Sequence, residues 1–217
     1  MRRCVTNFVF VLLVAAGCVS APPARAQTDA APYGTNLITN GDAESDFGAD
    51  DASTVVKPTG WTTTGAFSVV RYGAKGDFPD ISTPGSGGGE QNFFAGGNAA
   101  VSTATQTISL TPFATEIDAG RVKYALIGKL GGWGSLQDSA VVTVTFKNAS
   151  QRVAGSARIG PVEAAQRLLN TAFVEQEQSG TIPPLSRTAD VEIVLTRAGS
   201  AGYNHGFADS LSFAVTR

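Results

Sequence analysis

Aromatic side chains next to glycines are the residues with the clearest chemical potential in this sequence. Trp133 lies in a Gly-Gly-Trp-Gly stretch, and Gln137 and Asp138 follow it closely. A sugar ring stacks its apolar C–H face on an exposed aromatic ring, while amide and carboxylate groups pair with its hydroxyls. The small neighbours leave the ring uncovered, so we expect Trp133, Gln137 and Asp138 to contact a carbohydrate. Packing in a protein core is the alternative for Trp133.

Tyr203 and Asn204 form a second candidate contact of the same kind near the C-terminus. Tyr203 follows a glycine, and Asn204 supplies an amide beside it. Other aromatic residues, Trp61 and Phe94, are expected instead to fill the ends of a sandwich core. The predicted ligand contacts are therefore Trp133, Gln137, Asp138, Tyr203 and Asn204, with packing in the core as the alternative for Tyr203 as for Trp133.

Residues for catalysis are scarce. His205 is the single histidine, and no G-x-S-x-G nucleophile elbow is present. Both cysteines, Cys4 and Cys18, lie in a segment that we expect to be removed, which argues against thiol catalysis, cysteine-bound zinc and iron–sulfur chemistry. The acids could supply a glycosidase pair, but none lies in a recognisable catalytic context. A non-catalytic binding module is favoured over a glycoside-acting enzyme.

The N-terminus has the organisation of a signal peptide. Arg2 and Arg3 precede an apolar run over residues 8–16, and Ala24-Arg25-Ala26 matches the small-residue cleavage pattern. We expect residues 1–26 to be removed, residues 27–35 to form a flexible leader and the protein to be secreted, extracellular or periplasmic. Lipid anchoring through Cys18 is disfavoured, because Ala15 stands where a large aliphatic residue is usual. The apolar run is too short to span a bilayer, so no membrane insertion is expected after cleavage.

The charge balance argues against nucleic acid as a partner. The formal net charge is −2, and it falls to −5 once Arg2, Arg3 and Arg25 are removed with the leader. Nucleic-acid binding depends on a surplus of basic side chains that pair with phosphates.

The elements that must position these residues are short strands. Nine alternating or β-branched runs predict an all-β sandwich of about nine strands, built as one domain over residues 36–217. The runs are residues 37–39, 66–72, 92–95, 100–110, 122–130, 140–147, 152–159, 189–196 and 208–215. Two brief helices are expected at residues 112–118 and 161–169, each begun by a proline. The glycine-rich residues 84–90 predict a mobile loop.

Both ends of this domain carry sequence motifs that resemble those of a known domain family. The opening Asn36-Leu37-Ile38-Thr39-Asn40-Gly41-Asp42-Ala43-Glu44 resembles the "NLxxNGxxE" start of galactose-binding-like jelly-roll domains, the fold of many carbohydrate-binding modules. The segment from Asn204 to Phe213, with Asp209 just before the last strand, is similar to their close. The His between Asn204 and Gly206 departs from the more usual acidic residue.

The resemblance implies a structural calcium ion held by Glu44 and Asp209, with Asp42 as a supplementary ligand. Two acids on paired terminal strands repel unless a hard cation lies between them, and Ca²⁺ accepts carboxylate and carbonyl oxygens. Solvated loop acids are the alternative.

The resemblance also implies that the partner is a polysaccharide or other glycan. A structural or adhesive role among envelope proteins, without a small ligand, remains the alternative, since both functions need an exposed patch on a sandwich.

Overall fold

The computed structural model describes residues 33–86 and 90–217, so the expected signal peptide, the site at Cys18 and most of the expected leader lie outside the described residues. The same holds for residues 87–89 of the glycine-rich loop. The elements of the described part are, in chain order, β1 (Ala49–Asp51), β2 (Thr62–Thr64), β3 (Ser68–Lys75), β4 (Asn92–Gly97), β5 (Val101–Ser109), the 3-10 helix η1 (Thr111–Phe113), α1 (Ala114–Asp118), β6 (Lys123–Gly132), β7 (Ser139–Asn148), β8 (Val153–Ile159), β9 (Ala172–Thr181), β10 (Ser186–Thr196) and β11 (Asn204–Thr216).

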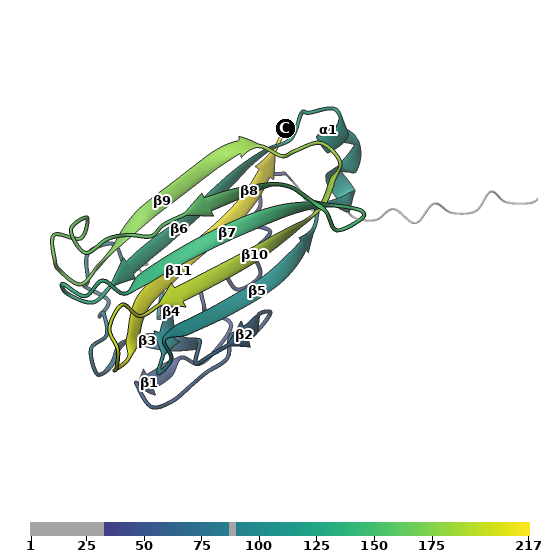
Figure 1. Ribbon diagram of the computed structural model, residues 1–217. Helices are drawn as coiled ribbons and strands as arrows, with labels where there is room; N and C mark the ends of the chain where they lie inside the picture. The colour runs from purple at the N-terminus through teal and green to yellow at the C-terminus, as the bar shows by residue number, and fades with distance from the viewer. Residues whose placement is uncertain (1–32, 87–89) are drawn as a thin grey trace, which may run out of the picture.

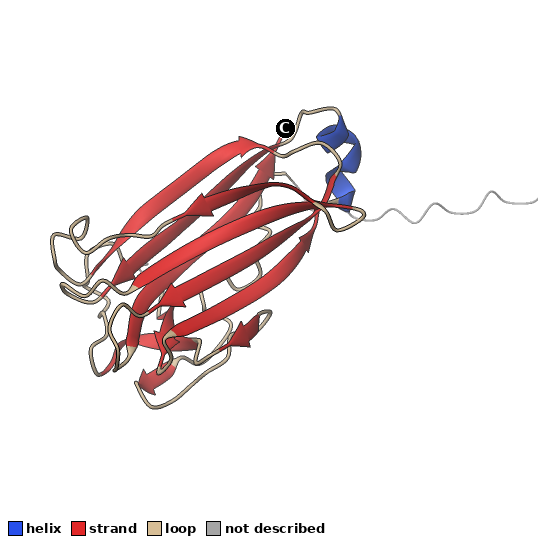
Figure 2. Cartoon of the chain, viewed as in Figure 1, coloured by secondary structure: helices blue, strands red, loops and turns tan. Residues whose placement is uncertain are grey.

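The strands form two sheets packed face to face (Figures 1 and 2). The six-stranded sheet has the order β1-β3-β4-β11-β6-β9, and the five-stranded sheet has the order β2-β5-β10-β7-β8. All neighbouring strands pair antiparallel except β1 and β3, which are parallel. The predicted all-β sandwich is confirmed, with two more strands in the described residues than the nine expected.

Alternation along the strands builds the core between the sheets. In β7 and β10 every second residue is buried, because successive side chains of a strand point to opposite faces. Val144, Phe146 and Ile193 thereby join one large buried cluster. Phe94 is fully buried in that cluster and Trp61 packs against it, with ring centroids 6.0 Å apart, so the core role expected for both is confirmed.

The structure differs from the sequence-based expectations at two expected elements and at three strands that were not expected. Residues 37–39 form turns, with a single bridge from Asn36 to Ala214. The expected helix over residues 161–169 is a series of turns, in which Leu168 and Leu169 have positive φ. The short strands β1 and β2 and the edge strand β9 were not predicted. The brief helix expected at residues 112–118 is present as η1 and α1.

The turns at residues 161–169 have a physical cause in tertiary contacts. Arg167 is 3% exposed, and its guanidinium donates hydrogen bonds to the backbone carbonyls of Gly132, Gly134, Leu136 and Asn170. These bonds satisfy carbonyls of two loops at once and replace the ladder of a regular helix.

The opening and closing motifs of the chain lie side by side. Asn36 donates from its amide to the Leu211 carbonyl and accepts from the backbone N–H of Phe213. The Leu211 N–H in turn donates to the carbonyl of Gly41 at 2.8 Å. The two segments that carry the galactose-binding-like resemblance therefore fasten the start of the domain to its last strand.

Candidate functional site

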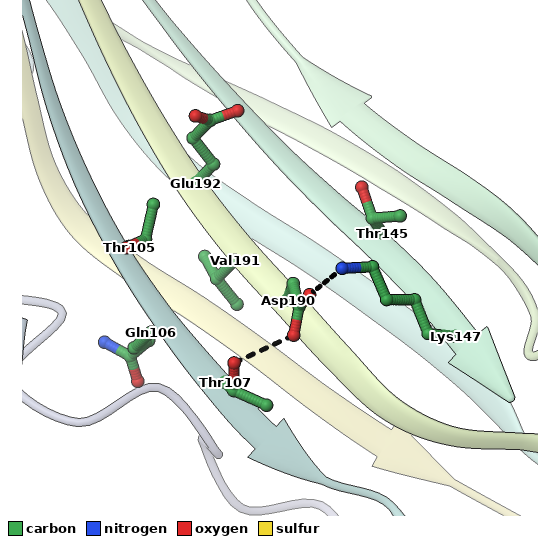
Figure 3. Close-up of a pocket in the computed structure, with 8 residues that line it drawn as sticks. All are labelled: Thr105, Gln106, Thr107, Thr145, Lys147, Asp190, Val191 and Glu192. Atoms are coloured by element: carbon green, nitrogen blue, oxygen red, sulfur yellow. Dashed lines mark hydrogen bonds and ion pairs between the residues drawn. The ribbon is translucent and has the colours of Figure 1, made fainter. Parts of the chain in front are cut away.

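An open groove crosses the outer face of the five-stranded sheet (Figure 3). It has a volume of about 450 Å³. Side chains from β5, β7 and β10 line it, and these are Thr105, Gln106, Thr107, Thr145, Lys147, Asp190, Val191 and Glu192. With the exception of the buried Val191, every lining side chain carries a hydrogen-bonding group.

Strand alternation and register bring these side chains together. The residues that flank each buried position of β10 point outward, and Asp190 lies opposite Thr107 of β5 and Thr145 of β7. Glu192, two residues further, lies opposite Thr105. Opposite residues of paired strands have Cβ atoms about 5 Å apart, so three strands supply one continuous polar surface.

Asp190 is held at the centre of the groove. Its Oδ1 accepts a hydrogen bond from the Thr107 hydroxyl at 2.8 Å, and its Oδ2 pairs with the Lys147 ammonium at 2.5 Å (Figure 3). Both charged side chains are about one third exposed. Because both carboxylate oxygens are engaged, the position of the Asp190 carboxylate is fixed.

Glu192 and Thr145 provide the uncommitted groups of the groove. Within the described residues, the Glu192 carboxylate and the Thr145 hydroxyl form no hydrogen bond or ion pair. Glu192 is exposed, so its two oxygens can accept from ligand hydroxyls without losing protein partners. This surface was not predicted from the sequence. The only signal was the threonine alternation at residues 103–107 and 143–145.

Trp133 and Tyr203 lie elsewhere, over a second buried cluster that belongs to the six-stranded sheet. We call this the aromatic cluster, and its rings are Phe78, Phe93, Phe173 and Phe207. Trp133 and Tyr203 are partly buried against it. The Tyr203 ring lies 5.0 Å from that of Phe78, and burial raises the pKa of Tyr203. The small neighbours of Trp133 therefore do not leave its ring fully uncovered.

Gln137 is exposed, whereas Asp138 and Asn204 are buried scaffold residues. Asp138 is 4% exposed and accepts hydrogen bonds from the backbone N–H groups of Ala198 at 2.9 Å and His205 at 2.8 Å. Asn204 is fully buried and donates to the carbonyl of Leu195. Both side chains tie loops together, so their polar atoms are already occupied by backbone partners.

His205 lies between these groups, where burial favours the neutral form of its ring. Its ring is 6.4 Å from Trp133 and 5.3 Å from Tyr203. Burial lowers the pKa of His205 below its usual range, although the nearby Asp138 carboxylate opposes that shift.

The three acids expected to hold calcium accept hydrogen bonds from different partners. Glu44 Oε1 accepts from the backbone N–H groups of Gln91 and Asn92, both at 2.8 Å. Asp42 accepts from the N–H of Glu44 in its own turn. Asp209 accepts from the Tyr72 hydroxyl at 2.7 Å. Glu44 thus contacts the start of β4, whereas Asp209 contacts Tyr72 of β3.

Asp209 is the most perturbed acid of this region. It is fully buried, and it precedes a bulge of β11 at which Ser210 has positive φ. Burial raises the pKa of Asp209 to about 8, the hydrogen bond from Tyr72 opposes the rise, and the neighbouring Glu90 carboxylate adds to it. Asp209 therefore keeps its proton near neutral pH in the absence of a cation.

A calcium ion fits these donors poorly. In residues 33–86 and 90–217, no three His, Cys, Asp or Glu side chains gather around a common point that could hold a metal ion. The oxygens of Glu44 and Asp209 described above already accept protein hydrogen bonds. Calcium binding by Glu44, Asp209 and Asp42 remains a prediction from the sequence.

No helix in the same residues has the length and apolar character that a membrane span requires.

Comparison with known proteins identifies the fold. No protein-family model matches the sequence, and no curated protein matches it. A cyclase from Fischerella sp. TAU, solved in complex with 4-(1H-indol-3-yl)butan-2-one, is similar at a TM-score of 0.55 and 13% identity, over 84% of this chain and 97% of that one. The CBM22-1 xylan-binding domain of Paenibacillus barcinonensis Xyn10C matches at a TM-score of 0.45 and 12% identity, over 87% of this chain and 99% of that domain.

The enzymatically active domain of tailspike protein 4 from bacteriophage CBA120 matches at a TM-score of 0.49 and 15% identity, over 84% of this chain. The chain spans only 22% of that protein's length. At such identities the likenesses concern the fold alone, and one fold hosts unrelated functions. The chain has the jelly-roll β-sandwich fold expected from its galactose-binding-like motifs.

Proposed function

We propose that the protein is a non-catalytic module that binds a hydroxyl-rich glycan in the groove of the five-stranded sheet. The observation that carries this proposal is the composition of the groove, where side chains of three adjacent strands offer hydroxyl, amide, carboxylate and ammonium groups. A sugar chain presents many hydroxyls that both donate and accept hydrogen bonds, so a polar open surface suits it better than it suits an apolar ligand.

The dimensions and rigidity of the groove support the same proposal. Its volume of about 450 Å³ falls within the usual range of small-molecule sites, and it opens along the sheet rather than into the core. The Lys147–Asp190–Thr107 network fixes its centre. The side chains already held in this network lose little freedom when a ligand binds, which limits the entropic cost of recognition.

The arrangement of the acids supports a non-catalytic role. Glycoside hydrolysis needs two carboxyl groups that flank the bond, one of which can take up and release a proton. In the groove, Asp190 is bound on both oxygens, which leaves Glu192 as the free carboxylate among the lining residues. The proposal includes export of the protein after cleavage of the signal peptide behind Ala26, because a secreted module meets extracellular polysaccharides.

Retention of the purified protein on a panel of polysaccharides tests this function. Glu192→Gln and Thr145→Val alter the two uncommitted groups of the groove and should reduce retention at least several-fold, with unchanged melting. Glu177→Gln is the matched control, because Glu177 is an exposed glutamate of β9 without a side-chain partner in the described residues. Retention that survives both groove changes would contradict the groove, and no retention on any glycan would contradict the function.

A further inference from the structure

Phe47 stands out among the large apolar residues of the described chain. Its side chain is 99% exposed, whereas the four phenylalanines of the aromatic cluster are at most 6% exposed. Burying a phenylalanine stabilises a folded protein, so a fully exposed ring gives up that gain. Single exposed hydrophobic residues are common, and the significance of Phe47 depends on what surrounds it.

Phe47 lies on the rim of a polar depression. The depression has a volume of about 340 Å³ and is lined by Glu44, Asp46, Phe47, Gly48, Arg71, Gln91 and Asn92. It lies at the β1–β3 edge of the six-stranded sheet, so it is formed by a different sheet from the groove of Figure 3. Around the ring are therefore guanidinium, amide and carboxylate groups, the partners that sugar hydroxyls need.

The segment that presents Phe47 is held rigidly. Asp46, its neighbour, accepts hydrogen bonds from the Thr59 N–H at 2.8 Å, the Thr59 hydroxyl at 2.7 Å and the Asn40 amide at 2.9 Å. On the other side, Gly48 lies so close to the Arg71 backbone and the Asn92 side chain that a Cβ atom would not fit. The backbone at Phe47 is thus held in place by its neighbours, so the exposure of the ring does not come from a flexible loop.

Arg71 and Gln91 offer free donors in this depression. The Arg71 side chain is half exposed, and among the described residues its guanidinium forms one hydrogen bond, to Asp50 at 3.2 Å. Asp50 is itself 77% exposed, so that pair is a weak surface contact. The Gln91 side chain is exposed and has no partner in the same residues.

We propose that Phe47, Arg71 and Gln91 form a second glycan-binding subsite, in which a neutral sugar ring stacks on Phe47 and its hydroxyls pair with Arg71 and Gln91. The lining acids and bases are mixed in sign, which favours a neutral ring over a strongly charged one. The glycan class rests on the proposed function. The location does not, because the depression shares no residue with the groove. Two separated subsites let one protein hold two chains, or two points of one chain, and so raise its avidity.

Isothermal titration with neutral β-linked glucan, xylan and mannan hexasaccharides tests the subsite. Wild type should bind two equivalents of the hexasaccharide that it prefers. Phe47→Ala should remove one equivalent or weaken that event at least tenfold, and Arg71→Gln should weaken it less. Melting should not change, because the ring is exposed. Leu185→Ala is the matched control, since Leu185 is 60% exposed in the turn between β9 and β10.

The outcomes separate this proposal from the function itself. If Glu192→Gln removes binding while Phe47→Ala leaves both stoichiometry and affinity unchanged, the second subsite is refuted and the groove stands. If Phe47→Ala abolishes the only binding event and Glu192→Gln has no effect, the subsite stands and the groove is refuted. Absence of binding to all three hexasaccharides counts against both.

Discussion

The buried carboxyl group of Asp209 should make the stability of the protein fall as pH rises, and replacement by asparagine should remove that dependence. Asp209 is fully buried, next to Glu90, and its pKa is raised from 3.8 to about 8. The folded state therefore keeps a proton that the unfolded chain releases near pH 4. Stability from this group is complete below pH 4, falls as pH rises to about 8 and is constant above it.

The magnitude follows from the size of the shift. A rise of about 4 pKa units at about 1.4 kcal/mol each corresponds to a loss of up to about 6 kcal/mol of unfolding free energy between pH 4 and 8. Asparagine is a neutral mimic of the protonated acid. Its amide oxygen can accept from the Ser210 N–H, and its NH₂ group can donate to Tyr72 and Glu90, so the local contacts survive.

Urea unfolding of wild type and Asp209→Asn from pH 4.5 to 8.5, in EDTA and followed by tryptophan fluorescence, measures this effect. The two proteins should be similarly stable at the acidic end and diverge as pH rises, with Asp209→Asn several kcal/mol more stable at pH 8. Glu90→Gln should give an intermediate slope, because it removes the neighbouring charge. Glu177→Gln should leave the wild-type profile unaltered. Parallel profiles for wild type and Asp209→Asn would refute the reasoning.

Three further outcomes are expected. Trp133→Ala should lower the unfolding free energy by about 2–3 kcal/mol in a urea titration, because the ring packs on the aromatic cluster. If the urea midpoint is unchanged and glycan retention is lost, Trp133 is a ligand contact instead. If Glu44 and Asp209 bind calcium, a calcium concentration a hundred-fold above Kd should stabilise the folded state by about 2.7 kcal/mol and raise Tm above its value in EDTA. Identical Tm values in calcium and in EDTA would contradict the calcium site. Mass spectrometry of the exported protein should find a chain that begins near Gln27 without lipid, and a diacylated Cys18 would overturn secretion as a free protein.

The sequence predicted those strands whose own pattern decides their structure. The run Val141-Val142-Thr143-Val144-Thr145-Phe146 is β-branched and alternates, so β7 follows from local preference and burial together. β9 was missed because its Glu175-Gln176-Glu177-Gln178 stretch has neither feature. It forms a strand because β6 offers a free edge, and an edge strand tolerates polar residues. The strand conformation of such an element is determined by its tertiary contacts and not by its own sequence.

The candidate sites were less accessible to prediction. Trp133 was singled out by its glycine neighbours, but the cluster against which it packs is formed by distant parts of the chain. The groove joins side chains of β5, β7 and β10, whose register a single sequence does not reveal. Phe47 gave no local signal either, since exposure of one phenylalanine depends on how the turn around Asp46 is fastened to Thr59.

The central claim, that a glycan binds across β5, β10 and β7, is tested most directly by two-dimensional amide NMR. Wild-type protein is titrated with an oligosaccharide cut from the polysaccharide that retains it. Binding in the groove predicts saturable shift changes at the amides of Thr105, Thr145 and Glu192, which Glu192→Gln weakens at least several-fold. Saturable shifts that leave these three amides unchanged would contradict the claim.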